Sequence, residues 1–502
     1  MRSLLSVATS MAVAAGVAVA APIPASAQPV EPDNVCIASV PETDPLEPGP
    51  VDICVSVFQP AGASKDNRAP VLLHSHGWGG SRTSTAGSFQ RYLDAGFGVV
   101  SIDQRGFGDS GGKAHVEDPA FEGQDVINVI DYVAGLDWVK RNGPNDPVLG
   151  ALGGSYGGGY QFVGAFTELM ETGRTRFDAL APQITWYSLS ESLAPNEVVR
   201  STWVSALYAA GLDAHTSTVH AGFAEGLATG DWPASQQEFF ADNGPAFHVD
   251  AGRKLNIPVL LYQGISDNLF PLDQAIKNFD RALTDRARRN SILVGYNGGH
   301  ALPNVLPLGS AVSGDACSEQ LAGSYEELEL RFYQENLLGA PRTLTGHGRY
   351  HMMTSGGECV SVDSVAPTTE SDLPDITTTT AAGVPQAVKI ADGPLTIAGT
   401  PQVHALVTAL GLDARAFFAL SVGTSPADAQ VIQNNVMPHR EESINLGTRR
   451  SIELPSVAAT IGEGESLFLT VSPTSDMFAV HGSRTPGGLR LEDVTASLPV
   501  VP

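Results

Sequence analysis

The sequence predicts a doubly wound α/β domain that is interrupted by a helical insertion and followed by an all-β domain. Up to residue 339, short apolar runs alternate with segments of helical apolar spacing, which is the pattern of a mostly parallel sheet. The alternation stops in one stretch where several aromatic residues stand in helix-like surroundings. Later in the chain, short β-type runs separated by turn residues indicate a β-sandwich or jelly roll. The expected organisation is an export signal at 1–27, an α/β domain at 28–339 with a lid at about 187–250, a linker or crossover at 340–392, and the β-sandwich at 393–502.

The first 27 residues have the pattern of an export signal. Arg2 gives a positive start, an apolar run follows from Leu4 to Ala21, and Ala25-Ser26-Ala27 is a small-x-small cleavage site. We therefore expect a secreted protein after cleavage near Ala27. Because Arg2 is the only ionised side chain removed, the formal net charge of −25 becomes −25 − 1 = −26. This charge argues against nucleic acid or an anionic membrane as a partner.

Four cysteines fit an oxidising destination, which favours two disulfides over free thiols. Of the three possible pairings we expect Cys36–Cys54 and Cys317–Cys359, because each closes the shorter loop. Four buried free thiols are the alternative. The chain has no Cys-x-x-Cys, so a zinc ribbon is not expected, and the sequence predicts neither a metal nor a cofactor.

The predicted strands of the α/β domain are short and apolar. They lie at 51–58, 71–74, 98–103, 148–152, 179–184, 259–263 and 291–294. Apolar residues with helical spacing predict helices near 89–95, 123–139, 161–170, 273–287 and 324–338. The β-type runs of the second domain lie at 395–397, 403–407, 417–422, 451–454, 466–471 and 489–498.

A candidate nucleophile stands between the strand at 148–152 and the helix that follows. Gly153-x-Ser155-x-Gly157 has the nucleophile-elbow pattern, in which a serine on a sharp strand-to-helix turn is lifted above the sheet edge. The flanking glycines leave room for the tight turn. The alternative is a Gly-rich surface turn, since the chain has 53 glycines.

Suitable partners for Ser155 follow in the order Ser, acid, His that this type of fold uses. Asp267 stands in the loop after the strand at 259–263, and His300 lies just past the strand at 291–294. An acyl-transfer site also needs donors for the oxyanion. We expect the backbone N–H groups of Tyr156, directly after the nucleophile, and of Trp78 in the segment His76-Gly77-Trp78-Gly79-Gly80.

Four aromatic residues at the start of the insertion are candidates for a substrate pocket, because a lid in this position covers the strand ends where open α/β sheets bind ligands. They are Trp186, Tyr187, Trp203 and Tyr208. The alternative for most aromatic residues of the insertion is that they form the core of the lid itself, because aromatic residues at helical spacing usually pack inward. Asp103, Arg105 and Asp109 lie in a Gly-rich loop near the site, and we expect them to hold that loop by hydrogen bonds rather than to take part in catalysis.

Several stretches together resemble the X-Pro dipeptidyl-peptidase/cocaine-esterase-type (CocE/NonD) serine hydrolases of the α/β-hydrolase superfamily. They are Gly154-Ser155-Tyr156-Gly157-Gly158, the loop 103–112, the segment 257–267, and the tail segments 395–401 and 436–440. The resemblance implies an α/β-hydrolase domain with a C-terminal jelly roll, and a triad of Ser155, Asp267 and His300 acting on ester or amide substrates. Family members often place a tyrosine hydroxyl in the oxyanion hole where this chain has Trp78. No acidic cluster for a substrate α-amino group is identifiable.

Three functions fit the sequence. The first is an exported esterase, amidase or peptidase that works through an acyl-enzyme on a small-molecule ester, amide or peptide substrate and needs no cofactor. The second is an acyltransferase with the same triad. The third is a non-catalytic protein that binds the cell wall through its jelly roll. The residue pattern specifies neither the natural substrate nor the oligomeric state.

Overall fold

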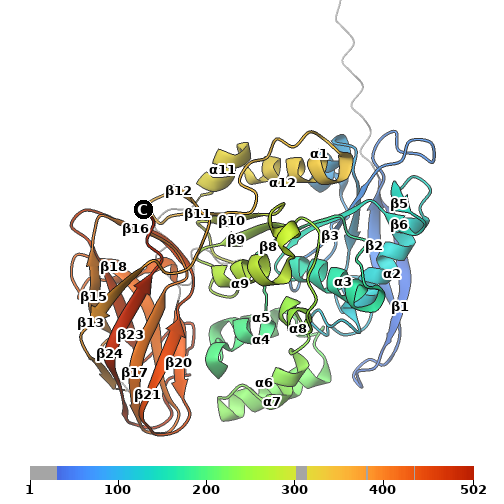
Figure 1. Cartoon of the computed structure of the whole chain (residues 1–502). Helices are drawn as coiled ribbons and strands as arrows, with labels where there is room; N and C mark the ends of the chain where they lie inside the picture. The colour runs from blue at the N-terminus through green and yellow to red at the C-terminus, as the bar shows by residue number, and fades with distance from the viewer. Residues whose placement is uncertain (1–30, 301–313, 380–382, 435) are drawn as a thin grey trace, which may run out of the picture.

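The structure, a computed structural model, describes residues 31–300, 314–379, 383–434 and 436–502. The expected export signal lies outside these residues. A ten-stranded sheet runs through the first domain, and its strands from β4 to β11 are parallel (Figure 1). In spatial order these strands are β1 (Asp33–Glu42), β2 (Gly49–Phe58), β4 (Gly98–Ile102), β3 (Val71–Ser75), β7 (Leu149–Gly154), β8 (Ala179–Gln183), β9 (Leu260–Gly264), β10 (Ile292–Tyr296), β11 (Tyr350–Met353) and β12 (Cys359–Val362). The predicted doubly wound fold is confirmed.

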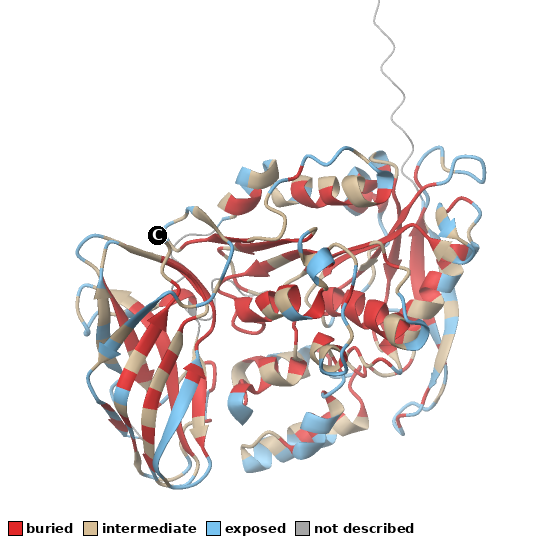
Figure 2. Cartoon of the chain, in the orientation of Figure 1, coloured by how far each residue is buried: buried red, intermediate tan, exposed pale blue. Residues whose placement is uncertain are grey.

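Helices cover both faces of this sheet (Figure 1). One face carries α2 (Glu122–Gly135), α3 (Tyr156–Thr172) and α9 (Leu272–Lys277), which pack on a core that includes Val129, Phe166 and Leu261. The other face carries α1 (Gln90–Asp94), α11 (Ala316–Ala322) and α12 (Tyr325–Tyr333), whose core includes Phe332 and Tyr333. Smaller elements are η1 (Ala86–Phe89), the hairpin β5 (Arg141–Gly143) and β6 (Asp146–Pro147), η3 (Asn278–Ala282), α10 (Asp285–Arg288) and η4 (Gln334–Leu338). The sheet is the buried centre of the domain (Figure 2).

The insertion after β8 is helical, as its composition predicts. It contains α4 (Leu189–Leu193), η2 (Pro195–Glu197), α5 (Ser201–Ala210), α6 (Ser217–Thr229), α7 (Ala234–Phe239) and α8 (Pro245–Asp250). Its apolar residues form a separate cluster with Tyr156, Leu269 and Phe478, which come from three other parts of the chain. The outer faces of α6 and α7 are exposed (Figure 2). We refer to residues 187–250 as the lid.

The C-terminal domain is all-β and stands beside the α/β domain (Figure 1). One sheet has the order β13-β24-β17-β21 with β14 also on β24, and the other has the order β15-β23-β18-β19 with β20 also on β18. A further pair is β16–β22. Their bounds are β13 (Thr369–Leu373), β14 (Ile376–Thr379), β15 (Gln386–Asp392), β16 (Leu395–Gly399), β17 (Gln402–Leu410), β18 (Ala414–Gly423), β19 (Gln430–Val431), β20 (Met437–Glu441), β21 (Asn445–Glu453), β22 (Val457–Ile461), β23 (Ser466–Ser472) and β24 (Gly488–Leu498), with η5 (Ile432–Asn434) between β19 and β20.

Residues 340–392 are not the linker or loose crossover that their composition predicts. β11 continues the parallel sheet beside β10, and β12 closes that edge as an antiparallel strand. β13, β14 and β15 already belong to the C-terminal sheets. Thr- and Ser-rich segments form strands here because neighbouring strands supply hydrogen-bond partners for their backbones.

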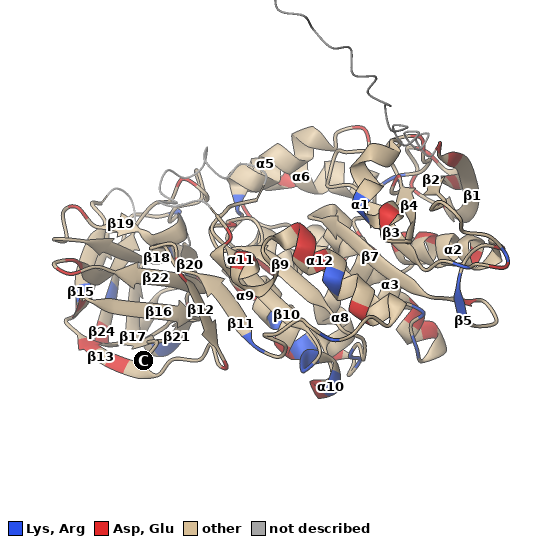
Figure 3. Ribbon diagram, turned by 90° about the horizontal axis from the view of Figure 1, so that it is seen from above, with Lys and Arg blue, Asp and Glu red and all other residues tan. Residues whose placement is uncertain are grey.

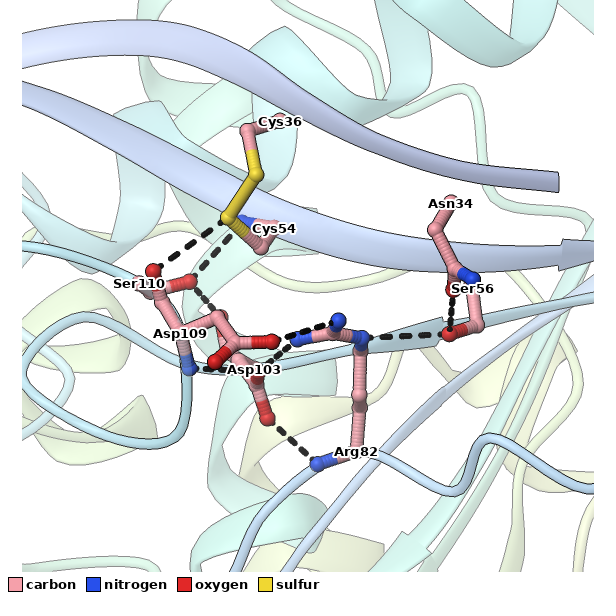
Figure 4. The surroundings of a disulfide bond; sticks show 8 residues. All are labelled: Asn34, Cys36, Cys54, Ser56, Arg82, Asp103, Asp109 and Ser110. Carbon is pink, nitrogen blue, oxygen red and sulfur yellow. Dashed lines mark hydrogen bonds and ion pairs between the residues drawn. A yellow bond between two sulfur atoms is a disulfide. The ribbon is translucent and has the colours of Figure 1, made fainter.

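Both expected disulfides are present, Cys36–Cys54 between β1 and β2 and Cys317–Cys359 between α11 and β12. Figure 4 shows the first one beside the Gly-rich loop after β4. Arg82 forms ion pairs with Asp103 and Asp109 there, and the backbone N–H of Asp109 donates to Asp103 at 2.9 Å. These contacts hold the loop in place, which is the structural role that the sequence predicts for the two carboxylates.

Candidate active site

Ser155 stands on a strained turn between β7 and α3. Its φ of 58° and ψ of −119° lie in a region that non-glycine residues rarely adopt. The turn is closely packed against β3, because a Cβ atom at Gly157 would lie 2.4 Å from the carbonyl oxygen of Ser75. At Gly153, with φ of 138°, a Cβ atom would lie 2.5 Å from the carbonyl oxygen of Gly157. Only glycine fits these two positions, and the serine is therefore held where the strand ends.

The structure brings Ser155, His300 and Asp267 into one hydrogen-bonded chain. The Oγ atom of Ser155 lies 2.8 Å from Nε2 of His300. The Nδ1 atom of the same ring lies 2.7 Å from Oδ2 of Asp267. The three side chains follow β7, β9 and β10, so their meeting is a consequence of parallel strands that end at one edge of the sheet.

Asp267 is fully buried and has a complete set of hydrogen-bond donors. Its Oδ1 atom accepts from the backbone N–H groups of Leu269 at 3.0 Å and Phe270 at 2.9 Å. Its Oδ2 atom accepts from Nε2 of Gln263 at 3.2 Å in addition to the histidine. These bonds fix the carboxylate and direct one oxygen at His300. The imidazole is further held by edge-on contacts with the rings of Phe270 and of Trp203 in the lid.

The loop after β3 passes directly beside the nucleophile. A Cβ atom at Gly77 would lie 3.8 Å from the Cβ atom of Ser155, so the neighbouring Trp78 backbone borders the same space. Its N–H group forms no hydrogen bond within the described residues. The N–H group of Tyr156 opens α3 and so has no partner one turn earlier in the helix. The indole of Trp78 is turned away and donates to the carbonyl oxygen of Leu207 at 2.9 Å.

Carboxyl groups lie buried behind the elbow, a feature that the sequence analysis did not find. Glu122 accepts from the backbone N–H of His115 at 2.8 Å and from the hydroxyl of Tyr156 at 3.4 Å. Burial, together with the nearby charge of Asp125, raises the pKa of Glu122 to about 8. Burial and Glu122 also raise the pKa of Glu117 well above its ordinary value. These shifts favour the protonated, neutral form of both groups in the core.

Arg105 is completely buried beside this group. It donates to both oxygens of Asp125, at 2.9 and 2.7 Å, and to the carbonyl oxygen of Val40 at 2.9 Å. Its role is structural, as the sequence predicts for this arginine. No group of three His, Cys, Asp or Glu side chains in the described part of the chain is arranged to hold a metal ion.

A pocket opens at Ser155 and runs beneath the lid. Its empty volume is about 1060 Å³, part of it open to solvent. Trp186 and Tyr208 line it, as predicted, together with Ser155, Tyr156 and Trp78.

The other two predicted pocket residues lie elsewhere. Tyr187 is buried away from the pocket, and the guanidinium of Arg281 lies over its ring, 6.0 Å from the ring centroid. Trp203 is outside the lining but contacts the ring of His300, and its indole donates to Oδ1 of Asn268 at 2.7 Å.

The comparisons with known proteins identify a family through a family model and a shared fold through solved structures. A family model described as X-Pro dipeptidyl-peptidase (S15 family) matches residues 49–301. A CocE/NonD-family hydrolase from Staphylococcus aureus is similar in fold, with a TM-score of 0.63 at 14% identity over 93% of this chain and 94% of its own. An α-amino acid ester hydrolase has a TM-score of 0.62 at 15% identity over 97% and 99% of the two chains. An aminopeptidase from a marine sediment Thaumarchaeota archaeon has a TM-score of 0.63 at 14% identity over 97% and 100%.

Among curated proteins, an uncharacterised 31.7 kDa protein of Escherichia coli is 32% identical over 97 residues, which are 19% of this chain and 32% of that protein. The match therefore spans about a third of the relative's length. No helix in the described residues has the length and apolar character needed to cross a bilayer.

Proposed function

This chain belongs to the X-Pro dipeptidyl-peptidase (S15) family and is a serine hydrolase, and on that premise we propose that Ser155, His300 and Asp267 form its catalytic triad. The observation that carries the proposal is the continuous hydrogen-bonded chain from Ser155 Oγ through both ring nitrogens of His300 to Asp267. Its substrates are small-molecule or peptide carboxylic esters or amides.

In the first step His300 Nε2 takes the proton of Ser155 as Oγ attacks the substrate carbonyl carbon. Asp267 keeps the proton on Nδ1, so that Nε2 is free to act as the base, and it stabilises the imidazolium that forms. The negative charge on the carbonyl oxygen is stabilised by the backbone N–H groups of Tyr156 and Trp78. His300 then gives its proton to the leaving alcohol or amine, and an acyl-enzyme on Ser155 remains.

In the second step water attacks the acyl-enzyme. His300 removes a proton from the water, the same two N–H groups stabilise the second oxyanion, and the proton returns to Ser155 Oγ as the acid leaves. No other reactant is needed. The strained backbone at Ser155 supports this assignment, because such strain persists where the surrounding structure holds a side chain in one position.

We also propose that the protein is exported. Residues 1–27 have the pattern of an export signal, and two disulfides are typical of an oxidising compartment. N-terminal sequencing of the protein from culture medium should start near residue 28. A full-length chain that stays in the cytoplasm would contradict export.

The test of the triad is labelling and turnover of a Ser155→Ala variant. The native enzyme should react with a fluorophosphonate probe and hydrolyse p-nitrophenyl acetate, whereas the variant should do neither and should melt at the same temperature. Ser235→Ala is the matched control, because Ser235 is exposed on α7, and it should keep full activity. Retained hydrolysis in Ser155→Ala would contradict the proposed nucleophile.

A further inference from the structure

The pocket at Ser155 lies beneath the lid and is lined mostly by apolar side chains. One face of α6 forms a long wall of it, because Val219, Gly222, Phe223 and Gly226 recur at helical spacing and all line the pocket. At about 1.5 Å per residue, this wall is roughly 10 Å long. The wall continues onto α5 through Val204, Leu207 and Tyr208, and the ring of Tyr208 stacks on that of Phe223. We refer to this part of the pocket, lined by α5 and α6, as the slot.

The slot holds no free charge among the described residues. The carboxylate and histidine side chains in the pocket lining are Asp231, His215 and His481. Asp231 is occupied by ion pairs with Arg484 at 2.8 Å and Arg415 at 3.4 Å.

The two histidines of the slot are neutral at pH 7. Burial lowers the pKa of His215, whose Nε2 lies 3.0 Å from the carbonyl oxygen of Tyr208. Burial and the nearby Arg415 also lower the pKa of His481. Since Asp231 is paired with two arginines, no carboxylate of the slot is free to bind a substrate ammonium group in the described part of the chain.

Two helices of the lid, α5 and α6, are nearly free of charged residues (Figure 3). Between Ser201 and Thr229 the charged side chains are Asp213 and Glu225. Leu227, which lines the pocket, is 70% exposed on α6. Apolar surface thus continues from the nucleophile to the solvent along one path.

The position of the slot relative to the triad decides which part of a substrate it would hold. The leaving group departs on the side of His300, which must protonate it. The slot lies beside the loop that carries the expected oxyanion donor: the ring centroids of Trp78 and His215 are 5.5 Å apart, and those of Tyr208 and Phe223 are 3.7 Å apart. His300 is absent from the pocket lining, and Phe270, which contacts it, lines the pocket away from α5 and α6. The slot is therefore placed to receive the acyl part.

We propose that the substrates are esters with an extended, uncharged hydrocarbon acyl chain, which lies in the slot while its carbonyl carbon is at Ser155. This inference rests on the proposed triad and names the substrate class of the same site. A dipeptide with a free N-terminus is a poor occupant, because its ammonium group would lose water and gain no counter-charge in the slot. Among the residues that the structure describes, the slot thus offers no carboxylate for an N-terminal amine.

The experiment is an acyl-chain-length profile. We expect kcat/KM for p-nitrophenyl esters, measured below their micelle concentrations, to rise about fourfold per added methylene from acetate to octanoate. The enzyme should hydrolyse X-Pro p-nitroanilides far more slowly than p-nitrophenyl octanoate. A flat profile, or X-Pro p-nitroanilide turnover above that of the octanoate ester, would overturn the inference. A dependence on the length of the alcohol in place of the acid would also overturn it.

A variant that narrows the slot tests the position of the chain. Gly226→Leu adds a side chain to the slot wall, and its Cβ atom has room, since the nearest atom would lie at 3.4 Å. In this variant, kcat/KM for p-nitrophenyl laurate divided by kcat/KM for p-nitrophenyl acetate should fall at least tenfold. Ala228→Leu, on the exposed face of α6, is the matched control and should leave the ratio unchanged. An unchanged ratio in Gly226→Leu, with a melting temperature close to that of the native enzyme, would contradict the proposal.

The two proposals fail in different ways. If Ser155→Ala still hydrolyses p-nitrophenyl acetate, the proposed triad is wrong, and the proposal about the slot falls with it. If hydrolysis of p-nitrophenyl acetate requires Ser155 but the chain-length profile is flat, the proposed triad stands. Only the inference about the acyl chain is then overturned.

Discussion

Replacing Asp267 by asparagine should abolish most activity while leaving the fold intact. In the native chain, two backbone N–H groups donate to Oδ1 of Asp267, and His300 and Gln263 donate to Oδ2. An asparagine has one acceptor and one donor in place of these two oxygens. Its oxygen must face the two backbone N–H groups, because its NH₂ group would otherwise point at two donors. The NH₂ group then faces Nδ1 of His300.

This arrangement forces His300 into the wrong tautomer. Nδ1 must accept from the asparagine, so the ring proton moves to Nε2, which then donates toward Ser155 Oγ and cannot take its proton. For a triad with this geometry the loss in kcat is on the order of 10⁴-fold, or about 5 kcal/mol of transition-state stabilisation. The cost in stability is far smaller. Gln263 loses one acceptor but keeps its bond to the carbonyl oxygen of Phe270, so we expect at most about 2 kcal/mol.

The assay is kcat/KM for p-nitrophenyl butyrate together with a thermal melt. Asp280→Asn is the matched control, because Asp280 accepts from Arg288 at 3.1 Å on the far side of the helix after β9 and has no contact with His300. It should keep activity within twofold. If Asp267→Asn keeps more than a tenth of the native rate, the carboxylate does not set the tautomer of His300 and the reasoning is wrong.

Three further predictions concern stability. Gly157→Ala should unfold or inactivate the enzyme, since its Cβ atom would lie 2.4 Å from a backbone oxygen and relief of such overlap costs about 1–3 kcal/mol. Gly135→Ala, where nothing lies within 4 Å of the new atom, should raise the melting temperature slightly, and equal behaviour of the two variants would refute the steric argument. Replacing Cys317 and Cys359 by alanine opens a loop of 42 residues and should lower the free energy of unfolding by about 4 kcal/mol in denaturant titrations; a loss below 1 kcal/mol would show that the bond is not a main constraint. Burial raises the pKa of Glu122 from 4.5 to about 8. Between these pH values the folded chain holds a proton that the unfolded chain releases. The free energy of unfolding should therefore fall as pH rises from 4.5 to about 8, and this group contributes at most about 1.4 kcal/mol per pH unit. In Glu122→Gln the slope of unfolding free energy between pH 5 and 8 should be shallower, and an unchanged slope would contradict the assignment.

Much of the site could be predicted from the sequence because its signals are local. An elbow needs glycines at fixed offsets from the serine, and parallel strands place whatever follows them at one edge of the sheet. The order and position of Ser155, Asp267 and His300 therefore predicted that the three side chains would be neighbours, and the structure places them at hydrogen-bonding distance. The disulfide pairing followed from loop length in the same way.

The prediction was wrong where a residue's environment depends on distant parts of the chain. The sequence between 340 and 392 looks like a linker because it is rich in Thr, Ser and Gly, yet β11 and β12 form there because β10 offers an unpaired edge. Tyr187 and Trp186 are adjacent and equally aromatic, and only the packing of the lid decides that Trp186 lines the pocket and Tyr187 does not.

The sequence by itself determined the fold class, the nucleophile elbow and the neighbours expected of Ser155, because hydrophobic period, glycine geometry and strand order act over short stretches of chain. Only the tertiary structure decided the shape and charge of the space at Ser155. The slot exists because apolar residues of α5 and α6 line one space, and it holds no free charge among the described residues because Asp231 pairs with arginines of the C-terminal domain. Both facts depend on contacts between segments far apart in the chain, which residue order does not encode locally.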